Sequence, residues 1–267
     1  MKRIIAIILL LPMLLCSVAC DRLRGDSLDG FLKSDGKEIL ETLYAFDSYV
    51  MTYTTVMYSA SAEKYVTFEV KTVFDRKNAL TYSEIKLDSA AYASFFVKDN
   101  TVYYDTLLGK TQKSKGPLSN ISELVHFTDV KARLSAISLP LSLSEGQLSS
   151  LKSKVSLTEG VGASHYVFSF GEKYFRYACA NTNGVFDSVF DGKIDENDIK
   201  VNDYTVTYSL DEDGELESVT DYNSFSVRRD GKKLNYEARV TIKEYHAKLE
   251  FNTDDYKDSS VGEYMKK

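Results

Sequence analysis

Cys20 carries a thiol near the N-terminus, and its sequence context is specific. Lys2 and Arg3 precede an apolar run over residues 4–15. A basic end followed by an apolar segment that is too short to span a bilayer comfortably is typical of a secretory signal. Small side chains at residues 17–19 stand directly before Cys20, as signal cleavage requires. We therefore expect residues 1–19 to be a signal peptide that is removed.

The stretch around Cys20 resembles the lipobox of bacterial lipoproteins, in which the cysteine is alkylated with diacylglycerol and becomes the new N-terminus. The resemblance implies that Cys20 is the lipid-attachment residue, and two or more acyl chains hold a protein firmly on a membrane. Ser17 stands where the family usually has Leu, and Cys16 is unsuited to the role because the large Leu15 precedes it. Asp21 resembles the inner-membrane retention signal of some two-membrane bacteria. The expected location is the extracytoplasmic face of the cell membrane; the alternative is an ordinary signal peptide with an incidental cysteine.

The other nucleophilic and imidazole side chains are isolated in the sequence. None of the three histidines stands in a metal-ligand pair or near a cysteine: His126, His165 and His246. Ser164 and His165 are adjacent on an expected strand, so they point to opposite faces. Cys179 is the one cysteine left besides the anchor, so it forms no internal disulfide, and we expect a half-buried strand residue. These patterns predict no catalytic residue and no enzyme activity.

An acidic stretch over residues 187–198 has the spacing of a calcium-binding loop. Six residues match loop positions of the EF-hand or dockerin type, with carboxylates as ligands and a glycine at the sharp turn: Asp187, Asp191, Gly192, Ile194, Asp195 and Asp198. Val189 stands where a third-position oxygen ligand is expected. The default interpretation is a solvated turn, with calcium binding as the alternative, so no metal or other cofactor is predicted.

The composition favours strands and excludes one class of partner. The chain of 267 residues has 19 Tyr, 14 Phe and only 3 Pro, with a formal net charge of −6. Aromatic and β-branched residues are enriched in strands. Acidic and basic residues are interspersed and form no basic stripe, so nucleic acid is not an expected partner. Anionic lipid headgroups are not attracted by charge either, so membrane attachment depends on the anchor.

The periodicity predicts a helix followed by two groups of strands with short helices between them. Residues 20–35 are mixed and turn-prone, typical of a tether behind the lipidated N-terminus. The apolar stripe in residues 36–46 predicts an amphipathic helix, with Asp35 near its start. Alternating side chains then predict strands over residues 49–107 and again over 154–251, including "KYFRYACA". Asp99 and Asn100 predict one hairpin turn, and residues 213–214 predict another.

The centre of the chain combines a loop with two helices. The stretch "LGKTQKSKGP" is polar and is predicted to be a loop. Asn120 with Glu123, and Ser144 with Gln147, have the spacing of capping boxes and predict two short helices. The expected domain is a single β-rich unit over residues 36–251, followed by a loosely held polar tail over 252–267.

This order of elements resembles the LolA-like architecture of lipoprotein carriers and of mycobacterial-type lipid-carrying lipoproteins. The stretches that carry the resemblance are "ETLYAFDSYVMTYTTVMY", "VKDNTVYYDT", "YTVTYSLDEDGELESV" and "ARVTIKEYHAKLEF". It implies an α+β fold in which a strongly curved antiparallel sheet forms an open half-barrel, with the N-terminal helix and the short central helices covering the concave face. It brings no invariant motif, so no binding residue is transferred.

The resemblance implies a cavity for acyl chains or another apolar ligand between sheet and helices. The same apolar stripes also fill an ordinary core. Two function classes therefore stay open: a lipid-anchored protein that binds a lipid or other apolar ligand, and a surface module with a solid core that contacts a protein or glycan. A continuous apolar hollow of several hundred Å³, on the order of known ligand cavities, would favour the first class, and its absence would favour the second.

Overall fold

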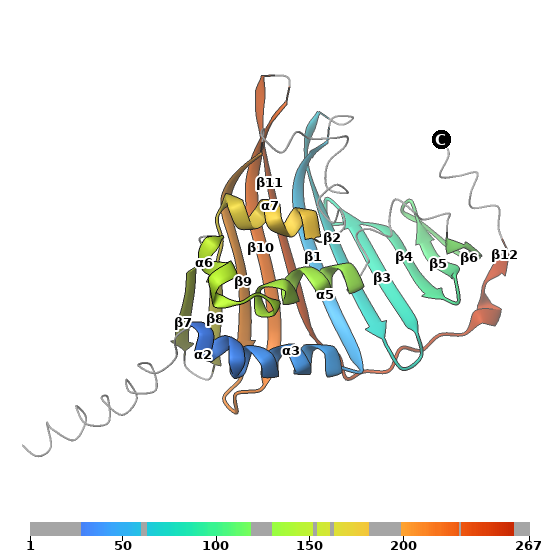
Figure 1. Ribbon diagram of the computed structural model, residues 1–267. Helices are drawn as coiled ribbons and strands as arrows, with labels where there is room; N and C mark the ends of the chain where they lie inside the picture. Colours follow the sequence, from blue (N-terminus) through green and yellow to red (C-terminus); the bar gives the residue numbers. More distant parts are fainter. Residues whose placement is uncertain are drawn as a thin grey trace, which may run out of the picture.

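The computed structural model describes residues 28–59, 63–118, 130–151, 154–160, 163–181, 199–229 and 231–258. These residues form a curved, unclosed sheet with short helices on its concave face (Figure 1). The α+β half-barrel expected from the sequence is confirmed. We call the face that the helices cover the inner face.

Twelve strands follow the order β12-β6-β5-β4-β3-β2-β1-β11-β10-β9-β8-β7. Every neighbouring pair is antiparallel except β12 and β6, which are parallel. The strands are β1 (Ser48–Ser59), β2 (Lys64–Asp75), β3 (Leu80–Leu87), β4 (Ala90–Lys98), β5 (Thr101–Leu107), β6 (Lys110–Pro117), β7 (Lys154–Gly160), β8 (Ala163–Ser169), β9 (Ile199–Leu210), β10 (Leu216–Arg229), β11 (Lys232–Glu244) and β12 (Lys257–Asp258).

The described helices are short. They are α2 (Leu28–Lys33), α3 (Asp35–Ala45), α5 (Val130–Ser138), α6 (Glu145–Ser150) and α7 (Glu172–Asn181), with 3₁₀ turns η2 (Leu139–Ser142) and η5 (Thr253–Asp255). In Figure 1, α3, α5 and α7 cross the part of the sheet built around β1, β10 and β11. The second predicted central helix corresponds to α6; the first, predicted from Asn120 onward, overlaps α5 at residues 130–134, and its earlier part lies outside the described residues.

Strand β1 joins the two halves of the sheet because it pairs with β2 on one side and with β11 on the other. Its side chains alternate between the faces as expected for a strand. Tyr49, Met51 and Tyr53 are buried under the helices, whereas Thr52 and Thr54 are exposed on the outer face. The inner-face positions of β11 are likewise buried, as the alternation in the sequence predicted: Tyr236, Ala238, Val240 and Ile242.

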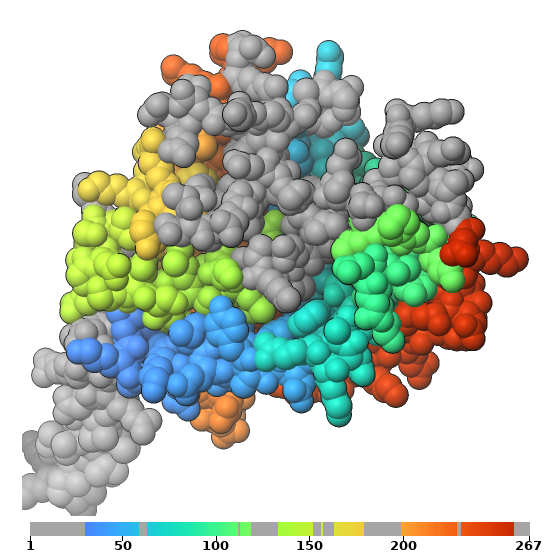
Figure 2. Space-filling model, turned by 45° about the vertical axis from the view of Figure 1, so that its right-hand side comes forward, coloured from blue at the N-terminus to red at the C-terminus, as the bar shows by residue number. Residues whose placement is uncertain are grey.

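Helices α3 and α5 form adjacent parts of the layer over the inner face (Figure 2). Helix α3 buries Ile39 and Leu43, and the hydroxyl of Tyr49 donates a hydrogen bond of 2.9 Å to the Leu43 carbonyl. The hydroxyls of Tyr44 on α3 and Ser138 on α5 lie 3.0 Å apart. Hydrogen bonds therefore connect this layer to the sheet and its helices to one another.

The strand predicted for "KYFRYACA" is wrong, because the structure places these residues in helix α7. Tyr174, Phe175 and Ala178 are buried, and their spacing is the i, i+1, i+4 pattern of one helical face. Glu172 accepts a 2.6 Å ion pair from Arg176 one turn later. Ion pairs between residues four apart stabilise a helix. The strand expectation relied on aromatic content and overlooked this period.

The polar loop predicted for "LGKTQKSKGP" is also wrong over residues 110–117, which form β6. Strand β6 lies near the edge of the sheet. It is held there by main-chain hydrogen bonds to β5, so it forms a strand without a row of buried apolar side chains. Among the described side chains of this strand, only that of Ser114 is buried.

Both ends of the expected domain carry additional packed structure. Residues 28–33 of the expected tether form α2, and Phe31 packs on the rings of Tyr166 and Phe168 at 4.2 and 5.8 Å. Near the C-terminus, Phe251 and Tyr256 pack on Phe96 and its neighbours on the outer face. Within the expected loose tail, Tyr256 is therefore packed and residues 257–258 pair with β6, whereas 259–267 lie outside the described residues.

The predicted turns and one predicted cap are confirmed. Asp99 and Asn100 have φ angles of 50° and 60°, as a tight hairpin requires. Gly214 has a φ of 85° in the β9–β10 turn. Ser144 and Gln147 form a complete capping box at α6. The Asn120 and Glu123 box lies outside the described residues.

Candidate ligand-binding centre on the inner face

Arg133 is a buried arginine on the side of α5 that faces the sheet. Its exposed fraction is 7%, and the neighbouring Leu134 and Ile137 are buried as well. The guanidinium carbon lies 4.5 Å from the centroid of the Tyr53 ring on β1. The guanidinium atoms Nε and Nη2 are buried without a hydrogen-bond partner, and no described carboxylate forms an ion pair with them. A buried arginine in this state is unusual, because buried charges are ordinarily paired.

Strand β10 presents two polar side chains to the inner face opposite α5. Asp221 and Asn223 are two residues apart, so they share a face, and both are buried. The Asn223 amide nitrogen donates to one Asp221 oxygen at 3.1 Å, and the hydroxyl of Tyr204 donates to the other at 3.3 Å. Arg133, Asp221 and Asn223 together make a polar centre within an otherwise apolar interior. We call these three residues the polar centre.

The electrostatics of the polar centre reflect its burial. Desolvation raises the pKa of Asp221 from 3.8 to about 6. The hydrogen bond from Asn223, the positive charge of Arg133 and the hydrogen bond from Tyr204 act in the opposite direction. The carboxyl group is therefore mostly ionised at neutral pH but takes up a proton in mildly acidic solution.

A small cavity lies beside two members of the polar centre, Arg133 and Asn223. It has a volume of about 10 Å³ and is lined by Tyr53, Thr55, Arg133, Asn223, Phe225, Tyr236 and Ala238. The oxygen of the Asn223 side chain is buried there without a hydrogen-bond partner. A cavity of this size holds about one water molecule. The aromatic rings of Phe225 and Tyr236, stacked at 5.4 Å, form its apolar wall.

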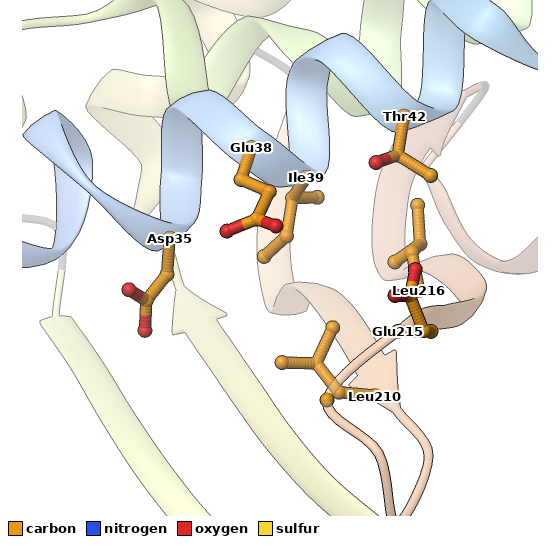
Figure 3. A pocket seen from close by; sticks show the side chains of 8 residues that line it. Asp35, Glu38, Ile39, Thr42, Leu210, Glu215 and Leu216 are labelled. Atoms are coloured by element: carbon orange, nitrogen blue, oxygen red, sulfur yellow. The ribbon is translucent and has the colours of Figure 1, made fainter.

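A second, larger cavity lies between α3 and the β9–β10 turn. It has a volume of about 240 Å³ and is open to solvent at the surface. Figure 3 shows Ile39 of α3 and Leu210 of β9 pointing toward one another across it, with the carboxylates of Glu38 and Glu215 nearby. We call it the α3 cleft. Neither cavity is the enclosed apolar hollow of several hundred Å³ that would identify a lipid carrier directly.

Most residues that the sequence singled out for chemistry fall outside the described part of the chain. Cys20, His126 and the acidic stretch 187–198 all lie there. Cys179 lies in α7 and not in a strand, and nothing is described of its side chain. Among the described residues, no three metal-binding side chains come together.

The two described histidines lie apart from the polar centre. The ring nitrogen Nδ1 of His165 is 3.0 Å from the hydroxyl of Ser209 on the neighbouring strand. The side chain of His246 is 81% exposed and lies 3.5 Å from a Glu244 oxygen. The expected Ser164–His165 separation agrees with their positions on β8, where adjacent side chains point to opposite faces.

The polar centre was not predicted from the sequence, although the residues carry a signal for it. Arg133 follows Val130 by three residues and precedes Leu134, so it lies on the apolar stripe of its helix. Asp221 and Asn223 occupy core-face positions of a strand between Val219 and Phe225. Charged residues at positions where the period demands apolar ones are the pattern that identifies such a centre.

Comparisons with known proteins give similarity to solved structures at low sequence identity. No protein-family model matches the chain, and no curated protein matches it. The Mycobacterium tuberculosis lipoprotein LppX is 10% identical, over 84% of this chain and 100% of LppX, with a TM-score of 0.41. LprF from Mycobacterium bovis is 10% identical, over 82% of this chain and 96% of LprF, with a TM-score of 0.30. A Vibrio parahaemolyticus domain assigned to outer membrane lipoprotein sorting is 8% identical, over 84% and 94%, with a TM-score of 0.23.

The class of fold follows from the described residues themselves. A curved, unclosed antiparallel sheet with short helices on its concave face is the open half-barrel that the sequence predicted. No helix within the described ranges is long and apolar enough to cross a membrane.

Proposed function

We propose that this chain is a lipid-anchored extracytoplasmic protein that binds an amphiphilic ligand between α5 and the inner face of its sheet. The observation that carries the proposal is the buried guanidinium of Arg133 with Nε and Nη2 unpaired. A buried donor without a partner costs about 1 to 3 kcal/mol, and more when it is charged. A ligand that supplies the missing acceptors recovers this energy when it binds. The polar centre is therefore best explained as a site that is completed by a ligand.

The apolar surroundings of the polar centre determine the rest of the ligand. Phe225, Tyr236 and Ala238 line one wall of the cavity, and the ring of Tyr53 lies under the guanidinium. Burial of an alkyl chain against such a wall contributes roughly 25 cal/mol per Å². A molecule with one polar end and an apolar body satisfies both parts of the site. A lipid or a lipid fragment has this chemistry.

The cavity of about 10 Å³ is too small for such a ligand, so binding requires α5 to shift away from the sheet. Two hydrogen bonds hold the C-terminal end of α5. The hydroxyl of Tyr208 donates to the Ile137 carbonyl at 2.6 Å, and Tyr44 meets Ser138 at 3.0 Å. The Arg133 guanidinium has no comparable hydrogen bond. The ligand enters beneath the part of α5 that carries Arg133 while the helix stays fastened at its C-terminal end.

The membrane anchor in this proposal is Cys20, with its acyl chains in the outer leaflet of the cytoplasmic membrane. Replacement of Cys20 by alanine then releases the protein from membranes, and metabolic labelling with a palmitate analogue marks the wild type only. If the wild type were not labelled by the palmitate analogue, or if the Cys20→Ala variant stayed on membranes, the assignment of Cys20 as the anchor would be contradicted. Neither result depends on the interior of the domain.

A surface interaction module remains the second candidate, and the α3 cleft is the observation that favours it. The cleft has an apolar floor and a carboxylate rim, with Glu38 and Glu215 outside any described ion pair. A partner segment with basic and apolar side chains would fit it. This candidate would be supported if the chain pulled down a protein, if Glu38→Lys and Glu215→Lys abolished that binding, and if no lipid were bound.

Mass spectrometry of the soluble chain tests the ligand proposal. The chain from position 20 onward, with Cys20→Ala, contains every described element and is free of the anchor. Organic extraction after native purification is expected to release a lipid in stoichiometric amount, and a fluorescent fatty acid is expected to bind saturably. Absence of both an extracted lipid and fatty-acid uptake would overturn the proposal.

A further inference from the structure

We infer that the polar centre binds the head group of the ligand, and that this head group is a two-oxygen anion, a carboxylate or a phosphate, next to a hydrogen-bond donor. The inference rests on the proposed function and specifies the ligand class. It is carried by the unpaired atoms of Arg133 and Asn223, two residues that line one cavity.

The two unpaired nitrogens of Arg133 lie on one edge of the guanidinium. Nε and Nη2 carry N–H groups that point in nearly the same direction, and this fork matches the two oxygens of a carboxylate or phosphate. The guanidinium carbon lies 4.5 Å from the centroid of the Tyr53 ring, and both nitrogens of that edge are without a hydrogen-bond partner. A bidentate anion is therefore the group that satisfies both nitrogens at once.

The orientation of the Asn223 amide is fixed by its neighbour. Its nitrogen donates to the carboxylate of Asp221 at 3.1 Å, so its oxygen is the atom directed elsewhere. That oxygen is buried without a partner and belongs to a residue that lines the same cavity as Arg133. An oxygen acceptor repels a bare anion, but it accepts a hydrogen bond from a hydroxyl or amide N–H. The head group therefore has a donor next to its anionic oxygens, as a hydroxy acid or a lysophosphatidate has.

Asp221 places one negative charge beside the proposed anion site. Its oxygens are engaged by Asn223 and Tyr204, so they do not compete for the Arg133 edge. Tyr174 and Tyr208 lie near enough to Asp221 to affect one another electrostatically, and both are buried phenols. Arg133 is the positive group that acts on Asp221, and the incoming anion adds a second negative group beside it.

Calorimetric titration of the Cys20→Ala chain from position 20 tests the inference with defined probes. The probes are dodecanoate, 3-hydroxydodecanoate, dodecanol, sodium acetate and inorganic phosphate, each below its micelle concentration where it has one. The variants are Arg133→Met, Arg133→Lys, Asn223→Leu and the control Arg239→Met. Arg239 stacks on Tyr222 at 4.9 Å as Arg133 does on Tyr53, but it lies exposed on the outer face.

The expected result is a loss of dodecanoate affinity of about 10- to 100-fold in Arg133→Met, the size of a charge-assisted hydrogen-bond pair. Arg133→Lys keeps the charge but not the fork, so its loss is intermediate. The 3-hydroxy acid binds about 3- to 10-fold more tightly than dodecanoate to the wild type, and Asn223→Leu removes this difference. Arg239→Met binds like the wild type, and unchanged thermal unfolding of each variant excludes misfolding.

Other outcomes separate the two proposals. Equal binding of dodecanol and dodecanoate, unaffected by Arg133→Met, would overturn the head-group assignment and leave the proposed function standing. If acetate or phosphate bound as tightly as dodecanoate, the site would be one for small anions, and the proposal of an amphiphilic ligand would be overturned. No binding of any probe, with an ordered water found on Arg133, would overturn both.

Discussion

The guanidinium carbon of Arg133 lies 4.5 Å from the centroid of the Tyr53 ring, beneath a helix and inside the fold. The same pairing occurs on the opposite face of the sheet, where the Arg239 guanidinium lies 4.9 Å from the Tyr222 ring. The chemistry of the two pairs is alike, but only the outer pair is open to solvent. The comparison isolates burial as the property that makes Arg133 a functional candidate.

Replacement of Arg133 by methionine is expected to raise the pKa of Asp221 above its value of about 6. The positive charge of Arg133 is one of the causes that hold this pKa down against desolvation. NMR titration of ¹³C-labelled aspartate carboxyls measures the change. Arg239→Met should leave the Asp221 pKa where it is, and an unchanged pKa in Arg133→Met would show that the two groups do not interact.

Stability should depend on the pH through Asp221. Its pKa is 3.8 in the unfolded chain and about 6 in the folded one, so the folded state binds the proton more tightly. This contribution to the free energy of unfolding is fully present below pH 3.8 and is lost as the pH rises through 6. The difference between wild type and Asp221→Asn should therefore fall by up to about 3 kcal/mol over that range. Urea unfolding at several pH values measures it, and a difference that is flat or that grows with pH contradicts the burial of an ionised Asp221.

The hydrogen bond between the hydroxyls of Thr72 and Ser83 should contribute more to the free energy of unfolding than a similar hydrogen bond on the outer face. These hydroxyls lie 3.1 Å apart and are fully buried on the inner face. Thr72→Val leaves the Ser83 hydroxyl unpaired and should cost about 1 to 3 kcal/mol of unfolding free energy. The double variant with Ser83→Ala should cost less than the sum of the single ones.

The matched control for that pair is the outer-face contact between Thr220 and Thr241, whose hydroxyls lie 3.0 Å apart and are half-buried. Water replaces the lost partner there, so Thr220→Val should cost less than Thr72→Val. Equal costs at the two sites would mean that burial does not determine the value of the bond.

The C-terminal segment should protect the β6 edge of the sheet. The hydroxyl of Tyr256 donates to Asp105 on β5 at 2.8 Å, and β12 follows it directly. Tyr256→Phe removes a hydrogen bond to a charged group and should lower the unfolding free energy by about 1.5 kcal/mol. Amide hydrogen exchange should accelerate at β12 and β6. Tyr82→Phe, which removes a bond to Glu84 within β3, should not accelerate exchange at this edge; similar exchange in both variants would contradict the role of Tyr256.

The sheet was predictable from the sequence because one face of each long strand is buried, and the period of two is then visible in the residues themselves. Val240 and Ile242 alternate with Arg239 and Thr241, and the structure buries the first pair. Strand β6 was not predictable in this way, since its identity depends on main-chain pairing with β5 and not on its polar side chains.

The polar centre was hidden for a different physical reason. Arg133 and Asp221 are 88 residues apart in number and come from a helix and a strand that meet only after the sheet has curved. Each residue interrupts the apolar pattern of its own element, but neither pattern alone shows that the two interruptions face one another. The anchor at Cys20 has the opposite character: its motif is local and readable from the sequence, and it lies outside the described residues.

Photo-crosslinking with a diazirine-bearing dodecanoate tests most directly whether the ligand lies between α5 and the sheet. The account predicts that peptide mapping finds the label on α5 and on the inner-face residues Phe225 and Tyr236, and that Arg133→Met abolishes it while Arg239→Met does not. Labelling confined to the α3 cleft around Glu38 and Glu215, or the same labelling in Arg133→Met as in the wild type, would contradict it.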